Sequence, residues 1–227
     1  MSRPPLVVDR RTRTRDDLLI AAQTLLATHS AGSLGIRQIA TQAGVVHGTF
    51  YNYYPDVDGL IDDLAALIVA SHATQVLDLR TDDHDPAVLF ARVTRRTLRL
   101  AAGGPTYGRL LFDAGLPVDR FIGGLRLAMG GDIIAGVAQG AFSVADASIA
   151  ISLTTGAILG AALDLHRGTL PPAAIDAVTA RLLESLGVPR DRAAALVAEP
   201  LADVPPPAPP LRWADIPSPL REALHAA

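Results

Sequence analysis

Apolar residues recur at every third or fourth position over most of the chain, which is the spacing of one face of an α-helix. Short breaks at glycine and proline separate the stretches with this pattern. We therefore expect helices over residues 14–29, 36–42, 47–53, 57–78, 86–102, 106–114, 117–139, 143–166, 173–186 and 191–198. Runs of β-branched residues, which would indicate strands, are missing from the sequence. The pattern predicts an all-α fold.

A glycine turn joins two of the shortest expected helices. Residues 36–42 and 47–53 are separated by Ala43-Gly44-Val45, and Gly44 can adopt the left-handed backbone conformation that ends a helix abruptly. Two short helices joined in this way form a helix-turn-helix, whose second helix enters the major groove of DNA. The pattern predicts a DNA-binding head with a helix-turn-helix over residues 12–69, and further helices after it.

The second of these short helices has an unusual composition. Residues 47–54 include three tyrosines, an asparagine, a threonine and a histidine, and residues 50–54 hold four of the ten aromatic residues in the chain. Phe50 can face the core, and Gly48 allows close approach to a phosphate backbone. The polar side chains can hydrogen-bond to phosphates and base edges. An aromatic packing helix is the alternative interpretation; the polar residues and the neighbouring arginines favour DNA.

Charge is distributed unevenly along the chain, whose net charge is −3. Residues 1–55 hold six arginines and three aspartates, whereas the remainder is acidic. We expect residues 1–11 to form a flexible basic arm. Arg10, Arg11, Arg13 and Arg15 would then contact the DNA backbone or minor groove, or alternatively form a solvated charge run. A basic end on an acidic body is typical of a DNA-binding head on a body that does not bind DNA.

The N-terminal third resembles the TetR family of transcription regulators. The resemblance rests on Thr14 to Ala22, on Ile36-Arg37-Gln38-Ile39-Ala40, and on the run from Ala43 to Pro55, in the family's order and spacing. It implies an all-helical homodimer, in which each subunit has a three-helix DNA-binding head and a larger helical body that binds a small-molecule effector. It also implies, most commonly, a repressor that its ligand releases from a near-palindromic operator. Carried over by position, the residues implied to contact DNA are Arg37, Val46, His47, Gly48, Thr49, Tyr51, Asn52 and Tyr53.

Two positions depart from the family pattern. The family commonly has serine or threonine just before the recognition helix, but this chain has Val46, which has no side-chain oxygen to cap the helix. The family commonly has a lysine at the start of the next helix, where this chain has Val57. The departures put one helix cap and one phosphate contact per half-site in question.

We expect residues 70–203 to form the effector-binding and dimerisation domain, and residues 204–227 a proline-rich tail that is mobile or weakly helical. A stripe of arginines over residues 92–99 is expected to be a solvated face. Helices 144–166 and 173–186 are the expected dimer surface, with packing inside one subunit as the alternative. Effector candidates by residue type, each of which also fits ordinary core or surface, are Phe90, Tyr107, Arg109, Phe112, Phe121, Arg126, Met129 and Phe142.

Other classes of function find little support in the sequence. Without cysteine there is no disulfide, thiol nucleophile or cysteine zinc site. We find no nucleotide-binding glycine motif, no hydrolase or metalloprotease motif and no targeting segment, and the uncharged stretch 147–163 is short for a membrane span. We therefore expect a cytoplasmic non-enzyme with no cofactor and no metal. The alternative is a helical adaptor or a small-molecule-binding protein without DNA binding.

Overall fold

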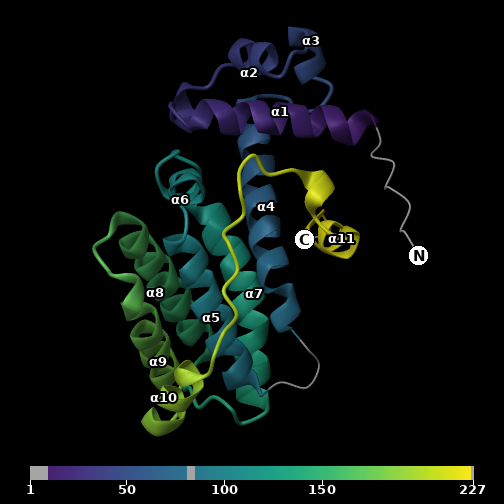
Figure 1. The fold of residues 1–227 in the computed structure, drawn as a ribbon. Coiled ribbons are helices and arrows are strands. Elements are labelled where there is room, and N and C mark those ends of the chain that lie inside the picture. Colours follow the sequence, from purple (N-terminus) through teal and green to yellow (C-terminus); the bar gives the residue numbers. More distant parts are fainter. Residues whose placement is uncertain (1–9, 81–84, 226–227) are drawn as a thin grey trace, which may run out of the picture. The chain divides into compact units, whose positions relative to one another are not determined.

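The computed structural model describes residues 10–80 and 85–225 (Figure 1). Contacts divide the chain into two compact units. The head unit holds residues 10–74, 109–117 and 208–225, and the body unit holds the other described residues. Within the described ranges the regular structure is helical and no strand forms, as the sequence predicts. Most of the arm expected over residues 1–11 lies outside the described residues.

The head unit is built on a small helical core. Its helices are α1 (Arg10–Leu26), α2 (Ile36–Gln42), α3 (His47–Phe50), most of α4 (Val57–Val76) and α11 (Ser218–His225). Its fully buried apolar side chains include Leu18, Leu19, Ile39, Phe50, Leu60, Leu64 and Leu67. Each such side chain stabilises the unit by about 1.5–3 kcal/mol relative to exposure. The helical spacing read from the sequence therefore identifies this core.

The first helix begins earlier than the sequence predicts. The sequence predicts a helix start at Thr14, but α1 begins by Arg10. The Thr14 hydroxyl lies inside the helix and donates to the carbonyl oxygen of Arg10 at 3.3 Å. Thr14 therefore does not cap the helix, because its hydroxyl is satisfied by the preceding turn. Arg11 and Arg13 therefore lie on a helix and not in an extended arm.

The C-terminal residues fold onto the head unit. The sequence predicts a separate tail over residues 204–227, whereas the residues from 208 onward group with the head. Trp213 and Ile216 are only 2% and 4% exposed, and α11 follows them. The segment is ordered because its few large apolar side chains are buried in the head.

The body unit contains the longest helices together with α9 and α10. Its helices are α5 (Pro86–Ala102), the first part of α6 (Pro105–Phe112), α7 (Val118–Ala138), α8 (Ala147–Arg167), α9 (Ile175–Ser185) and α10 (Arg190–Ala198). α8 begins where the Asp146 carboxylate accepts the backbone N–H groups of Ser148 and Ile149. It ends at Gly168, whose φ of +73° lies in the left-handed region that glycine adopts without a steric penalty.

Two arginines of α5 are buried and Arg92 and Arg99 are half-buried, so the solvated face predicted for residues 92–99 is wrong. Arg95 and Arg96 are each 3% exposed. Arg95 donates to Asp176 at 2.8 Å, and Arg96 donates to Asp78 at 2.5 Å. A guanidinium can be buried when carboxylates and carbonyls accept its N–H groups, and here these acceptors lie far away in the sequence.

The apolar stripe of α9 is used inside the body unit. Ile175, Leu182 and Leu186 are 5%, 8% and 1% exposed, and α9 packs against α5 and α10. The predicted dimer surface of helices 144–166 and 173–186 is therefore wrong in its second helix. A stripe at helical spacing indicates burial but does not say whether the partner is the same chain or another one.

Exposed apolar residues lie instead on α7 and α8, which pack against each other. Leu127 and Ile134 of α7 are 66% and 57% exposed, and Ile149 and Leu153 of α8 are 58% and 69% exposed. Small residues continue both stripes, since a Cβ added at Gly131, Gly156 or Gly160 would meet nothing within 4 Å. We call these seven residues the α7–α8 face.

Candidate nucleic-acid interface

The turn between α2 and α3 has the geometry of a helix-turn-helix. Gly44 has a φ of +68°, and the Val45 N–H donates to the carbonyl oxygen of Ala40 at 3.0 Å. The extended Val46 then precedes α3. The observed α2 matches its predicted range. The helix predicted over 47–53 is shorter, because the backbone leaves the α-helical conformation after Phe50 and continues as a turn through Tyr53.

The residues of this segment separate into an inner and an outer set. Phe50 is fully buried and Tyr54 is 5% exposed, so both hold the segment to the head core. The expected DNA contacts lie on the outside: Val46, His47, Gly48, Tyr51 and Asn52 are exposed, and Thr49 and Tyr53 are half-buried. The segment therefore presents polar groups on the surface while aromatic rings fix it from within.

The start of α3 is open to a binding partner. Val46 is 75% exposed and makes no side-chain cap, as the sequence predicts. A Cβ at Gly48 would meet nothing within 4 Å, and the rings of His47 and Tyr51 contact each other edge-on at 5.4 Å.

The arginines that were expected to contact DNA differ in whether their side chains are exposed. Arg37 is exposed on α2, and Arg10 and Arg13 are exposed on α1. Arg15 is engaged inside the head, because its guanidinium donates to both carboxylate oxygens of Asp63, at 2.7 and 2.5 Å. The expectation that Arg15 contacts DNA is therefore wrong.

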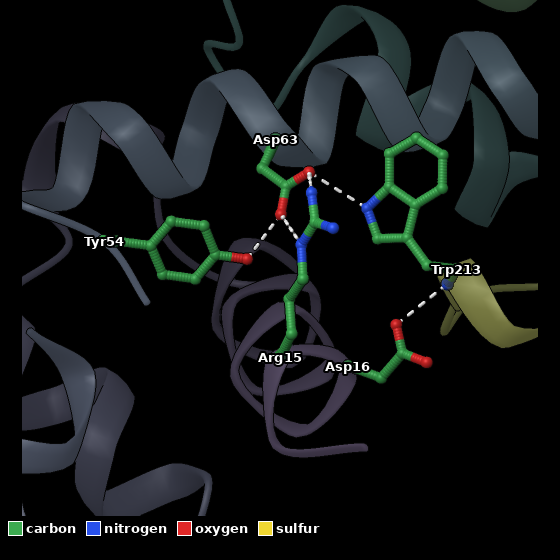
Figure 2. Close-up of polar contacts among 5 residues, drawn as sticks. All are labelled: Arg15, Asp16, Tyr54, Asp63 and Trp213. Carbon is green, nitrogen blue, oxygen red and sulfur yellow. Dashed lines mark hydrogen bonds and ion pairs between the residues drawn. The ribbon is translucent and has the colours of Figure 1, made fainter. Parts of the chain in front are cut away.

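Asp63 on α4 is the centre of a polar cluster that the sequence did not reveal (Figure 2). Besides Arg15, it accepts the Tyr54 hydroxyl at 2.5 Å and the Trp213 indole N–H at 2.9 Å. Burial, reinforced by the Asp63 charge, raises the pKa of Tyr54, so this hydroxyl stays a donor. One signal was present: Trp213 is the single tryptophan, and it lies in a region otherwise dominated by proline and alanine.

Most of the expected effector residues lie inside the body unit. Phe90, Tyr107, Phe121 and Met129 are at most 9% exposed, and Phe90 contacts Phe142 edge-on at 5.9 Å. Burial raises the pKa of Tyr107. This group has the apolar character of an effector site.

Three other candidates do not join that group. Arg126 is exposed on α7, so it does not line the interior of the body. Phe112 and Arg109 belong to the head unit by their contacts. Residue type alone could not separate these positions from the buried ones.

Two hydroxyl groups inside the body unit lack a hydrogen-bond partner. Thr94 of α5 and Thr155 of α8 are each 1% exposed, and neither Oγ1 is bonded. By contrast, the Thr179 hydroxyl donates to the carbonyl oxygen of Ile175, one turn earlier. α5 and α8 pack together, so the body carries polar groups that a bound molecule could satisfy.

Family models match both parts of the chain. One, described as bacterial regulatory proteins of the tetR family, matches residues 18–64. Another, described as the tetracyclin repressor-like C-terminal domain, matches residues 85–199. Together they cover more than half of the sequence. No curated protein sequence matches significantly.

Solved structures agree with the family models. RolR in complex with resorcinol is 26% identical, with a TM-score of 0.68 over 86% of this chain and 97% of that one. A fatty acid degradation regulator, FadR from Bacillus halodurans, is 16% identical, with a TM-score of 0.62 over 83% of this chain and 100% of that one. The second likeness shows the fold alone. The chain belongs to the TetR family of DNA-binding transcription regulators, which act as dimers and respond to small molecules.

Proposed function

We propose that the protein is a repressor that binds a near-palindromic operator as a homodimer and is released by a small molecule. The outer surface of α3 carries this proposal, because its exposed polar residues are held by a fully buried Phe50. In a dimer, two such helices would enter major grooves about 34 Å apart, or a small multiple of that distance.

The roles of the exposed residues follow from their chemistry. Asn52 can read an adenine edge through two hydrogen bonds, whereas Tyr53 and Thr49 can donate only single hydrogen bonds, which suit phosphates. Arg37 would contact a phosphate or a base from α2. The remaining contacts would come from Val46, His47, Gly48 and Tyr51 at the start and outer side of α3.

Selection of bound duplexes from a random-sequence DNA library tests the proposal. Enrichment of a near-palindrome, followed by a gel shift with the selected duplex, supports it. A folded protein that enriches no duplex would instead favour the adaptor, or the small-molecule-binding protein without DNA binding.

The Asn52→Ala variant should lose base discrimination. We expect it to bind the selected duplex about 1–3 kcal/mol more weakly, with the loss confined to the base pair that Asn52 reads. Tyr53→Phe should weaken all sequences alike. Thr24→Ala is the control, since this hydroxyl on α1 is exposed and donates to the carbonyl of Ile20 one turn earlier. Unchanged affinity and sequence preference in both Asn52→Ala and Tyr53→Phe would remove α3 from the interface.

We further propose that the α7–α8 face is the dimer interface. By length and apolar composition, α7 and α8 are among three helical segments of the described residues that could cross a membrane. In a soluble DNA-binding protein no lipid covers these exposed apolar faces, so another protein surface must bury them. A second copy provides it, because two helices and their symmetry mates form a four-helix bundle about a two-fold axis.

Gly160→Leu should produce a monomer. A Cβ added at Gly160 meets nothing within 4 Å in its own protomer, so the helical circular dichroism should persist while the bulky group blocks a second helix at a cost of about 1–3 kcal/mol. Sedimentation or a sizing column measures the change. Ala177→Leu, which also introduces a bulky apolar group but on the exposed side of α9, should stay dimeric. If Gly160→Leu stays dimeric as well, the interface lies elsewhere.

The effector is proposed to be a small aromatic compound with hydroxyl groups. RolR, which matches over most of its length, was solved with resorcinol. In this chain the buried aromatic residues of the body lie in the same unit as the unpaired hydroxyls of Thr94 and Thr155. The hydroxyl groups of such a compound would form hydrogen bonds with the hydroxyls of Thr94 and Thr155, and its ring would pack against the buried aromatic side chains.

Resorcinol should raise the melting temperature of the protein. A ligand that binds the folded state stabilises the protein by mass action. The gain is about 2.7 kcal/mol when the free ligand concentration is a hundred times Kd. Replacing Thr94 and Thr155 with valine keeps the shape of the side chains and removes the hydroxyls. Resorcinol should therefore raise the melting temperature of the double variant by less than that of the wild type. Thr179→Val, whose hydroxyl is bonded within its own helix, is the control. Equal shifts in all three proteins would exclude the two threonines from the site.

A further inference from the structure

The C-terminal segment 211–216 is bound to α1 through its backbone. The Gln23 amide donates to the carbonyl oxygen of Leu211 at 2.9 Å and accepts the Leu211 N–H at 2.7 Å. The Asp16 carboxylate accepts the N–H of Trp213 at 2.8 Å and that of Ala214 at 3.2 Å. Gln23 and Asp16 are 6% and 4% exposed, so α1 keeps two polar side chains buried whose partners lie in this segment.

The Trp213 side chain extends these contacts to α4. Its indole N–H donates to Asp63, and the Arg15 guanidinium lies 5.3 Å from the centre of its ring (Figure 2). A cation over an aromatic face and a charge-assisted hydrogen bond are both favourable when partly buried. Trp213 therefore joins α1, α4 and the C-terminal segment at one point.

The same carboxylate connects this point to the recognition helix. Asp63 accepts the hydroxyl of Tyr54, and the Tyr54 N–H donates to the carbonyl oxygen of Phe50, the last residue of α3. The turn after α3 is thus connected to Asp63 by hydrogen bonds, and Trp213 bonds to the same carboxylate.

The chain leading to the segment favours docking. Five of the nine residues 202–210 are proline, which restricts the conformations available before docking and lowers the entropy lost on it. Neither of the matched family regions, residues 18–64 and 85–199, includes the segment.

We propose that Trp213 is a positioning residue for DNA binding. Its indole orients Asp63, which holds Tyr54 and with it the exposed residues of α3 in the arrangement that fits the major groove. The segment 211–216 then belongs to the DNA-binding head although it lies at the other end of the sequence. The inference rests on the proposed DNA-binding function.

A double-mutant cycle on the full chain tests it. Trp213→Phe keeps an aromatic ring but removes the N–H donor, and Tyr54→Phe removes the hydroxyl. Each should bind the duplex selected by the wild type about tenfold more weakly. Because both act through Asp63, the double variant should lose about as much as either single one. The salt dependence of binding should stay unchanged, since neither residue would contact a phosphate.

Controls separate positioning from loss of folding. Affinities are compared well below the melting temperature of each variant, with circular dichroism confirming the fold, and exposed Asp215→Ala should bind as the wild type does. Asp16→Asn weakens docking but keeps the single tryptophan, so its emission should shift to the red as its DNA affinity falls. Unchanged affinity of Trp213→Phe, or losses that multiply in the double variant, would overturn the inference. A wild type that selects no duplex would refute the proposed function itself.

Discussion

Replacing Asp63 with alanine is expected to destabilise the protein by about 3 kcal/mol. Its carboxylate accepts two hydrogen bonds from Arg15, one from Tyr54 and one from Trp213. Removing one partner of a buried ion pair costs about 3–5 kcal/mol, and the lower end applies because the Arg15 side chain is 31% exposed. Tyr54, at 5% exposure, would also lose its acceptor.

Urea unfolding followed through Trp213 emission and circular dichroism measures this loss. The matched control is Asp58→Ala, an exposed aspartate in the first turn of the same helix. Asp58 lies where the helix dipole favours a negative charge, so its removal should cost less than about 1 kcal/mol. If the two variants lose equal stability, the Asp63 cluster does not hold the head together.

The helix-turn-helix could be predicted because its signals are local. Gly44 marks the turn, Ile39 and Phe50 mark the buried side, and α2 has the predicted bounds. Each of these features depends on residues within a few positions of one another. Backbone geometry and helical periodicity act over that range, and a sequence displays both directly.

The Asp63 cluster could not be predicted because its members meet only in the folded chain. Asp63 is separated by 48 positions from Arg15 and by 150 from Trp213. The arginines of α5 show the same limit, because charge in a helix suggests solvent unless the distant acceptor is known. The α9 stripe was misassigned for a related reason, since periodicity identifies a buried face but not what covers it.

The second large effect is expected at Gly187, where Gly187→Ala should destabilise the body unit by about 3 kcal/mol. Gly187 ends α9 with a φ of +86°, a conformation that costs a side-chain-bearing residue about 1–2 kcal/mol. A Cβ there would also lie 2.6 Å from the carbonyl oxygen of Ser143, whose own N–H donates to Leu186 at 2.9 Å. The backbone must move to relieve this contact, which adds a further penalty of about 1–3 kcal/mol.

Gly168→Ala separates the two contributions. Gly168 has a φ of +73° at the end of α8, but a Cβ there would meet nothing within 4 Å. This variant should therefore show the conformational cost alone, about 1 kcal/mol in urea unfolding at the same protein concentration. The difference between the two variants measures how tightly the end of α9 is packed on Ser143. If Gly187→Ala costs no more than Gly168→Ala, the backbone near Ser143 moves to relieve the contact without loss of stability, and the end of α9 is not fixed at this point.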